Sequence, residues 1–139
     1  MPKLPRPLAD RAPESEKVTI NLGYVDLGRI DLLVQEGFYA NRSDLIRAAI
    51  RNQLDGYAGV VAQSLSRKTL ELGLRDYDRA YLERVRAAGE VVDIKVVGLS
   101  RIASDVTPDL ARATIRTVSV LGALQASIEV RDALAARIL

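Results

Sequence analysis

The chain of 139 residues contains no cysteine and no histidine. Without cysteine it can form neither disulfides nor thiolate nucleophiles, and without histidine it lacks imidazole bases and nearly all zinc, copper or nickel sites. It also lacks a glycine-rich phosphate loop of the Walker type and a G-x-S-x-G nucleophile turn. These absences favour a protein that is not an enzyme and that holds no metal and no cofactor.

Long apolar runs are also missing. No stretch approaches the roughly 18 to 20 uninterrupted apolar residues of a membrane span, and the N-terminus lacks the apolar core of a secretory signal. Apolar residues nevertheless make up 48% and charged residues 27% of the chain, close to the composition of folded domains. We therefore expect a folded, cytoplasmic protein without a membrane partner.

Prolines are concentrated at the N-terminus, where four of the five lie within residues 1–15. Because proline cannot donate a backbone hydrogen bond and this segment has few bulky apolar residues, we expect residues 1–15 to form a flexible arm. The patterns that follow divide the remainder into two predicted domains, residues 16–57 and residues 58–139.

Residues 17–22 alternate strictly between polar and apolar side chains, which is the period of a β-strand with one buried face. The apolar side chains on one face are Val18, Ile20 and Leu22. The polar side chains on the other face are Lys17, Thr19 and Asn21.

Two amphipathic helices are predicted after this strand. The spacing of apolar residues indicates the first over residues 25–36, with Gly37 in the position after a helix that favours glycine. The second is expected to begin near Asn41 or Ser43, either of which can cap it. The predicted order is therefore strand, helix, helix.

A unit of about 40 residues with one strand cannot be stable by itself, because the strand lacks a hydrogen-bonding partner and little surface is buried. Antiparallel pairing with the same strand of a second chain, around a two-fold axis, solves both problems. The expected dimer core consists of apolar residues from the strand and the second helix: Val18, Ile20, Leu22, Ile46 and Ile50.

The outer face of such a ribbon carries Lys17, Thr19 and Asn21 from each chain. The major groove of B-DNA is about 12 Å wide and accepts a two-stranded ribbon, and these three side chains can form hydrogen bonds with base edges there. We therefore predict that they contact bases of double-stranded DNA.

The start of the second helix adds a second kind of contact. The net charge of +2 does not by itself indicate DNA binding, so the prediction depends on where groups are placed. Backbone N–H groups at Asn41, Arg42 and Ser43 can bind the phosphates that flank the groove.

This region resembles the ribbon-helix-helix superfamily, in its CopG-like branch related to Arc and MetJ, over KVTINLGYVDLGRIDLLVQEGFYANRSDLIRAAIRNQL. The resemblance implies an intertwined homodimer that inserts a β-ribbon into the major groove and usually acts as a repressor. By position, the polar face of the strand matches the family's base-contacting residues, and residues 41–43 match its phosphate-contacting helix start. Asn21 stands where a longer arginine or lysine is frequent in the family.

Residues 58–139 begin with a predicted helical linker and then repeat a short pattern. Three apolar strands are expected to end near Gly73, Gly98 and Gly122, which are almost equally spaced. A helix is expected after each strand, over residues 78–88, 107–117 and 128–138. Strand-helix units of this length resemble leucine-rich-repeat-like solenoids, and the alternative is a compact α/β domain in which the glycine period arose by chance.

Taken together, the patterns predict an α+β protein with an N-terminal ribbon-helix-helix dimer and a C-terminal α/β domain of about three strand-helix units. Its predicted function is sequence-specific, DNA-binding transcriptional regulation as a homodimer, with higher-order self-association through the open edges of residues 58–139. Two alternatives use the same DNA-binding module. One is an antitoxin whose C-terminal part wraps a toxin, and the other is a DNA-anchored scaffold that self-assembles through its repeats.

Overall fold

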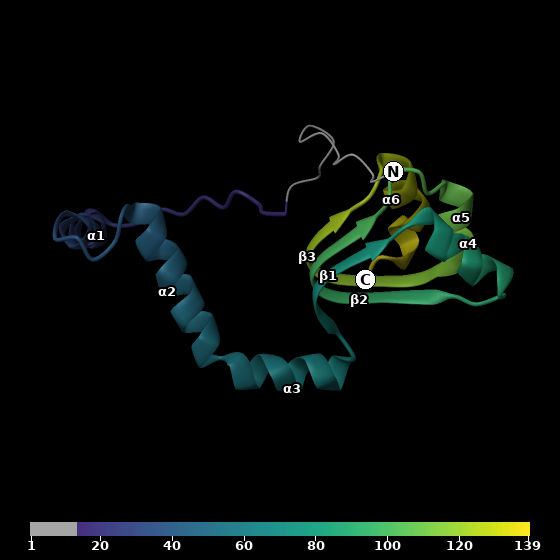
Figure 1. Ribbon diagram of the computed structural model, residues 1–139, viewed down its shortest axis with the longest axis horizontal. Coiled ribbons are helices and arrows are strands. Elements are labelled where there is room, and N and C mark those ends of the chain that lie inside the picture. Colours follow the sequence, from purple (N-terminus) through teal and green to yellow (C-terminus); the bar gives the residue numbers. More distant parts are fainter. Residues whose placement is uncertain (1–13) are drawn as a thin grey trace, which may run out of the picture. The chain divides into compact units, whose positions relative to one another are not determined.

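The computed structural model describes residues 14–139 (Figure 1). The arm expected over residues 1–15 therefore lies, up to Pro13, outside the described residues. The chain divides into two compact units, one of residues Ser15–Ser64 and one that contains Leu65–Leu139. In the part of the chain that the structure describes, no helix is both long enough and apolar enough to cross a membrane.

The described chain is an α+β protein. Its α-helices are α1 (Tyr24–Gln35), α2 (Arg42–Gly56), α3 (Ala58–Lys68), α4 (Arg79–Ala87), α5 (Pro108–Thr114) and α6 (Ile128–Leu134). Its strands are β1 (Glu71–Tyr77), β2 (Val92–Ile102) and β3 (Ile115–Gln125), and a 3-10 helix, η2 (Ala135–Arg137), follows α6. The helical linker predicted after Tyr57 is confirmed as α3.

The N-terminal unit has no buried core within the single chain, since none of α1, α2 and α3 contains a buried residue. Its exposed large apolar side chains are Val18, Ile20, Leu22, Tyr24, Val25, Leu32, Leu33, Phe38, Ile50, Leu54, Tyr57, Val60 and Val61. So many exposed large apolar side chains are unusual for a folded unit of a monomeric protein.

The C-terminal unit repeats strand and helix three times. Its strands form one parallel sheet in the order β1-β2-β3, and helix α4 contacts α5, which in turn contacts α6 (Figure 1). Each strand-helix pair thus packs on the next pair in sequence. The largest fully buried apolar side chains of this unit are Leu82, Ile94, Val96, Ile115, Val118, Val130 and Leu134.

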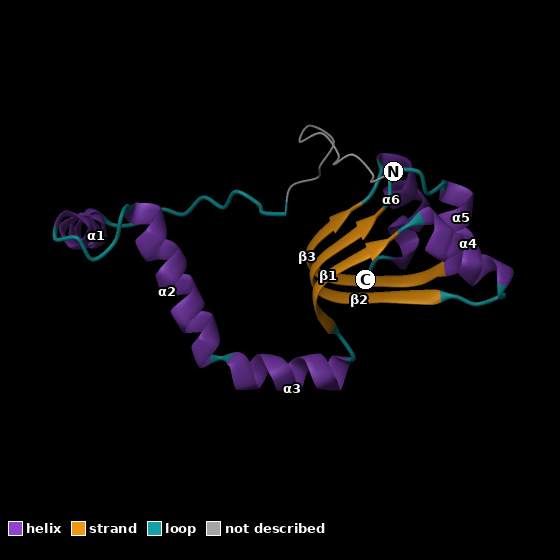
Figure 2. Ribbon diagram, in the orientation of Figure 1, coloured by secondary structure: helices purple, strands orange, loops and turns teal. Residues whose placement is uncertain are grey.

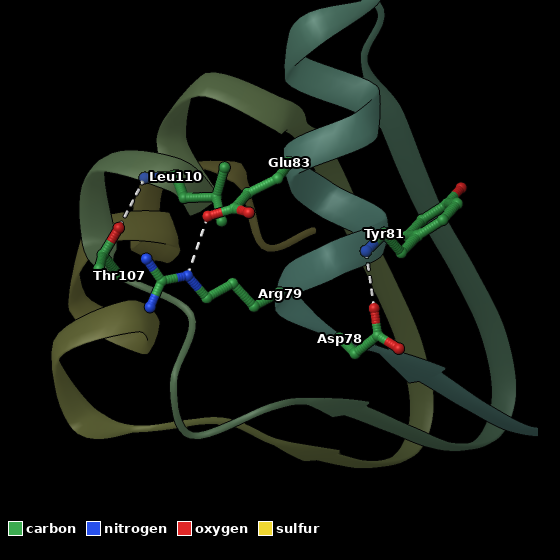
Figure 3. A network of polar contacts seen from close by, with 6 residues as sticks. All are labelled: Asp78, Arg79, Tyr81, Glu83, Thr107 and Leu110. Atoms are coloured by element: carbon green, nitrogen blue, oxygen red, sulfur yellow. Dashed lines mark hydrogen bonds and ion pairs between the residues drawn. The ribbon is translucent and has the colours of Figure 1, made fainter.

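Each of the three helices in the repeats begins with an N-cap, a side chain that accepts a hydrogen bond from the first turn. The side chains of Asp78, Thr107 and Ser127 accept hydrogen bonds from backbone N–H groups three residues later, at 2.7, 3.2 and 3.2 Å. Figure 3 shows the first two of these bonds. Because such caps satisfy N–H groups that the helix leaves unpaired, they set the start of each helix.

The glycines lie inside the strands, so the prediction that the strands end at glycine is wrong. Gly73, Gly98 and Gly122 are paired in register across the sheet, with φ angles of +132°, +137° and +114°. A Cβ atom at Gly98 would lie 2.2 Å from the carbonyl oxygen of Gly73, and one at Gly122 would lie 2.1 Å from that of Gly98. Glycine is therefore required where neighbouring backbones approach most closely.

The strands bend partway along their length, and the apex of the bend points away from the helices (Figure 2). Burial along β2 agrees with this shape. Ile94, Val96, Ser100 and Ile102 are buried on the two arms of the strand, whereas Gly98 between them is exposed. Alternate residues of both arms thus face the interior that α4, α5 and α6 close.

Two predicted helices end earlier than expected. Helix α5 stops at Thr114 instead of residue 117, because Ile115 and Val118 are fully buried in β3. Helix α6 stops at Leu134, and after η2 the residue Ile138 forms a parallel bridge with Val118. In both cases the residues predicted to form the end of the helix instead pack or pair in the sheet.

Asp93 joins β2 to β3 by polar contacts. Its carboxylate forms a bidentate ion pair with Arg116 and accepts a hydrogen bond from Thr117 Oγ1 at 2.7 Å. The Arg116 guanidinium and then the Thr117 hydroxyl lower the pKa of Asp93 from its ordinary value of 3.8 to about 2. The ionised form of Asp93 is thus favoured by the folded sheet.

We expect Gly98→Ala to lower the free energy of unfolding by about 3 kcal/mol or more, because it adds both a strained φ and a backbone clash. Gly89→Ala is the matched control, since Gly89 has a φ of +67° but nothing within 4 Å of its Cβ position. That control should cost only about 1 kcal/mol. Urea unfolding monitored by circular dichroism measures both, and equal losses would show that the close approach is unimportant.

We expect Asp93 to make the stability of the repeats depend on pH. Its pKa is lower in the folded than in the unfolded chain, so its contribution is complete above about pH 4 and is lost as the pH falls to about 2. Asp93→Asn and Arg116→Gln should each flatten the fall in unfolding free energy between pH 5 and pH 2. Their double variant should be no flatter than Asp93→Asn alone, and additive effects would contradict a shared interaction.

Candidate nucleic-acid interface

Residues 15–23 lie outside helices and strands and are exposed to solvent. The strand predicted over residues 17–22 is therefore not formed in the single chain. The physical reason is that a strand exists only through hydrogen bonds to a neighbouring strand, and no strand of residues 14–139 pairs with this segment. Lys17, Thr19 and Asn21 are accordingly exposed in this segment.

The apolar side of the same segment is also exposed. Val18, Ile20 and Leu22 retain 78%, 59% and 36% of their accessible surface. Of the two helical residues expected in the dimer core, Ile46 is half-buried and Ile50 is 54% exposed. All five residues of the predicted dimer core are therefore available to a partner.

The turn between α1 and α2 is built as predicted around Gly37. The N–H of Gly37 donates to the carbonyl of Val34 at 3.0 Å, and the N–H of Phe38 donates to the carbonyl of Leu33 at 3.0 Å. With a φ of +86° at Gly37, this is the Schellman arrangement that ends a helix. It ends α1 at Gln35, one residue before the predicted end.

Asn41 caps α2, which decides between the two predicted caps. Its Oδ1 accepts a hydrogen bond from the N–H of Asp44 at 2.9 Å. Arg42 and Ser43 follow in the first turn, where backbone N–H groups have no partner within the helix. The three residues expected to contact phosphate are thus adjacent at one helix start.

Arg42 also has a partner that the sequence patterns did not reveal. Its Nε and Nη2 donate to the two carboxylate oxygens of Asp31 at 2.7 and 2.8 Å, and this ion pair joins α2 to α1. Hydrogen bonding to Arg42 lowers the pKa of Asp31, and the same bond raises the pKa of Arg42. Residues 11 positions apart on two different helices give no periodic signal, so sequence reasoning could not find this pair.

We expect Asn41→Ala to destabilise the N-terminal unit by about 1 kcal/mol, because the N–H of Asp44 loses its acceptor. Asn52→Ala is the matched control, since Asn52 is exposed within α2, where alanine is the better helix former. Chemical unfolding followed by circular dichroism distinguishes the two variants. Similar losses for both would mean that Asn41 does not act as a cap.

Comparison with known proteins supports the interpretation of this unit. The model of a family described as the ribbon-helix-helix transcriptional regulator family matches residues 13–131, a range that covers all of residues 15–64 and most of residues 65–139. Comparisons with curated proteins and with solved structures gave no match. Because the family match covers most of the sequence, the chain belongs to the ribbon-helix-helix transcriptional regulator family.

Proposed function

We propose that the chain is a sequence-specific DNA-binding repressor whose N-terminal unit forms a homodimer through residues 17–22. The observation that carries this proposal is that α1, α2, α3 and the segment before them expose a series of large apolar side chains and bury none. Surface of this kind requires a partner, and membership of the family makes a second copy of the chain the natural one.

In the proposed dimer, residues 17–22 of two chains pair antiparallel around a two-fold axis. The pairing satisfies those backbone groups of each segment that face the other strand, and it turns Val18, Ile20 and Leu22 toward the helices. Ile46 and Ile50 of α2 complete the core, and each chain contributes the same surface. The two-fold axis also matches the symmetry of a palindromic DNA site.

The outward face of the ribbon reads the DNA sequence in this proposal. Lys17 donates to guanine O6 or N7, Asn21 forms a pair of hydrogen bonds with adenine, and Thr19 uses its hydroxyl or its methyl group. Their exposure in the single chain is what a reading surface requires.

Asn41, Arg42 and Ser43 position the dimer on the phosphate backbone in this proposal. Free N–H groups at a helix start bind phosphate, and the dipole of α2 favours the negative charge. The Asp31 carboxylate competes with phosphate for the Arg42 guanidinium, because both are bidentate acceptors. Arg42 therefore exchanges one partner for the other when it contacts DNA.

The C-terminal unit serves self-association in this proposal, and the protein acts in the cytoplasm without catalysing a reaction. The unit has a buried core of its own, which includes Leu82, Ile94 and Val118. An antitoxin segment that becomes ordered on a toxin usually lacks such a core. This observation favours a folded assembly domain over a segment that wraps a toxin.

We expect Asn21→Ala and Arg42→Ala to affect DNA binding in different ways. Asn21→Ala should relax the preference at one base position by about 1–3 kcal/mol, because it removes a base contact. Arg42→Ala should weaken binding to all sequences and reduce the salt slope by about 1, because it removes a phosphate contact. Selection of sites from a random pool, followed by titrations at several salt concentrations, measures both effects.

Asp31→Asn is the matched control for Arg42. If Arg42 contacts phosphate, loss of the competing carboxylate should leave binding unchanged or strengthen it for every sequence. If Arg42 only fastens α2 to α1, Asp31→Asn should weaken binding as much as Arg42→Ala does. Unchanged binding in both Asn21→Ala and Arg42→Ala would overturn the proposed function.

A further inference from the structure

The sheet of the C-terminal unit has two different edges. At the β3 edge the N–H of Leu139 donates to the carbonyl of Val118 at 2.8 Å, so the end of the described chain covers part of this edge. At the other edge, β1 pairs with β2 alone, and no strand of residues 14–139 lies on its outer side. An open strand edge presents unpaired backbone groups that can pair with another strand.

The residues of β1 are complementary to themselves when the strand is reversed. Around Gly73 the order is Glu71, Leu72, Gly73, Leu74, Arg75. In an antiparallel pair centred on Gly73, each glutamate faces an arginine and each leucine faces a leucine. Neither β2 nor β3 places opposite charges at the corresponding positions around its own glycine.

These side chains are available to a second strand. Leu72 and Leu74 are 68% and 44% exposed on the outer face. Glu71 and Arg75 are exposed as well, and within the chain they form an ion pair at 3.1 Å between Oε2 and Nε. In the antiparallel pair, each carboxylate would lie between two guanidinium groups, one from its own chain and one from the partner, so the charges would alternate.

The bend of the strands selects the register of such a pair. The strands bend partway along their length (Figure 2), and Gly98 lies between the two buried arms of β2, in register with Gly73. A second strand therefore continues the sheet only if its bend coincides with that of β1. In the antiparallel orientation this requires Gly73 to face the partner's Gly73. The Cβ direction of Gly98 points at the β1 backbone, whereas that of Gly73 meets nothing within 4 Å, so the space beside Gly73 is open in the single chain.

We propose that β1 pairs antiparallel with β1 of a second copy around a two-fold axis at Gly73, which joins two C-terminal units into one continuous six-stranded sheet. This inference rests on the self-association proposed for the C-terminal unit, but not on the proposed contacts with DNA. Its partner is another copy of this chain, since the charge pattern of β1 complements itself.

Disulfide trapping tests the register, because the chain has no cysteine of its own. Leu72→Cys chains refolded together with Leu74→Cys chains should form a covalent dimer on oxidation, since these positions face each other across the pair. Either variant alone should cross-link poorly, because its thiols are diagonal neighbours. Leu121→Cys refolded with Ala123→Cys, at the corresponding positions of β3, is the matched control and should not cross-link.

Charge reversal tests the role of Glu71 and Arg75 in the same assay. Glu71→Arg in both chains should lower cross-linking about tenfold, because like charges then face each other. Glu71→Arg in one chain and Arg75→Glu in the other should restore it. Neither chain of this mixture keeps the internal ion pair, so recovery would arise from contacts between chains.

Absence of cross-linking between the Leu72→Cys and Leu74→Cys chains would overturn the inference. The same conclusion follows if Glu71→Arg in both chains has no effect, or if the β3 control pair cross-links equally well. A chain that binds DNA but does not cross-link through β1 would retain the proposed function and lose only this inference. A chain that cross-links through β1 but binds no DNA would retain this inference and lose the proposed function.

Discussion

The backbone hydrogen-bonding requirement of a β-strand is the constraint on which the described structure depends. A strand with one free side leaves N–H and C=O groups without partners, and this requirement acts in both units of the chain. In the N-terminal unit, residues 17–22 have the alternation of a strand but pair with no strand of residues 14–139, so they lie outside helices and strands and are exposed. In the C-terminal unit, β2 is satisfied on both sides, whereas β1 is satisfied on one.

The close approach of neighbouring strands follows from the same requirement. Parallel strands in sequence order can bend together only if the residue at the bend has no side chain, because a Cβ at Gly98 or Gly122 would collide with the preceding strand. The glycine period is therefore a property of the sheet and not of any single strand-helix unit. Capping by Asp78, Thr107 and Ser127 then starts each helix at the same point of its unit.

The sequence predicted those features that local chemistry determines. Helix α1 lies within one residue of the predicted range because its apolar spacing and Gly37 act within the segment itself. Asn41 was one of two predicted caps for the same reason, and the structure shows that it is the cap. The predicted end of the second repeat helix was wrong because burial of Ile115 in the sheet, a contact with residues distant in sequence, decides where α5 ends.

The candidate site was predictable to a smaller extent. Alternation identified Lys17, Thr19 and Asn21 as a polar set, but the ion pair of Arg42 with Asp31 depends on how two helices pack, which no period in the sequence encodes. That pair gives Arg42 a definite orientation in the single chain. In the proposed contact with phosphate, this preorganisation would reduce the conformational entropy lost on binding, and exchange of the Asp31 contact would offset part of the gain.

Two self-complementary surfaces on one chain have a consequence that neither has alone. In the proposed dimer through residues 17–22, two C-terminal units would be held together, so pairing of β1 within that dimer would be intramolecular and would proceed at a high effective concentration. Pairing of β1 between different dimers instead links two DNA-binding units, and each bound unit then raises the local concentration of the next. The segment α3 joins the two proposed surfaces in sequence, so its geometry would decide whether β1 pairs within one dimer or between dimers on adjacent operators.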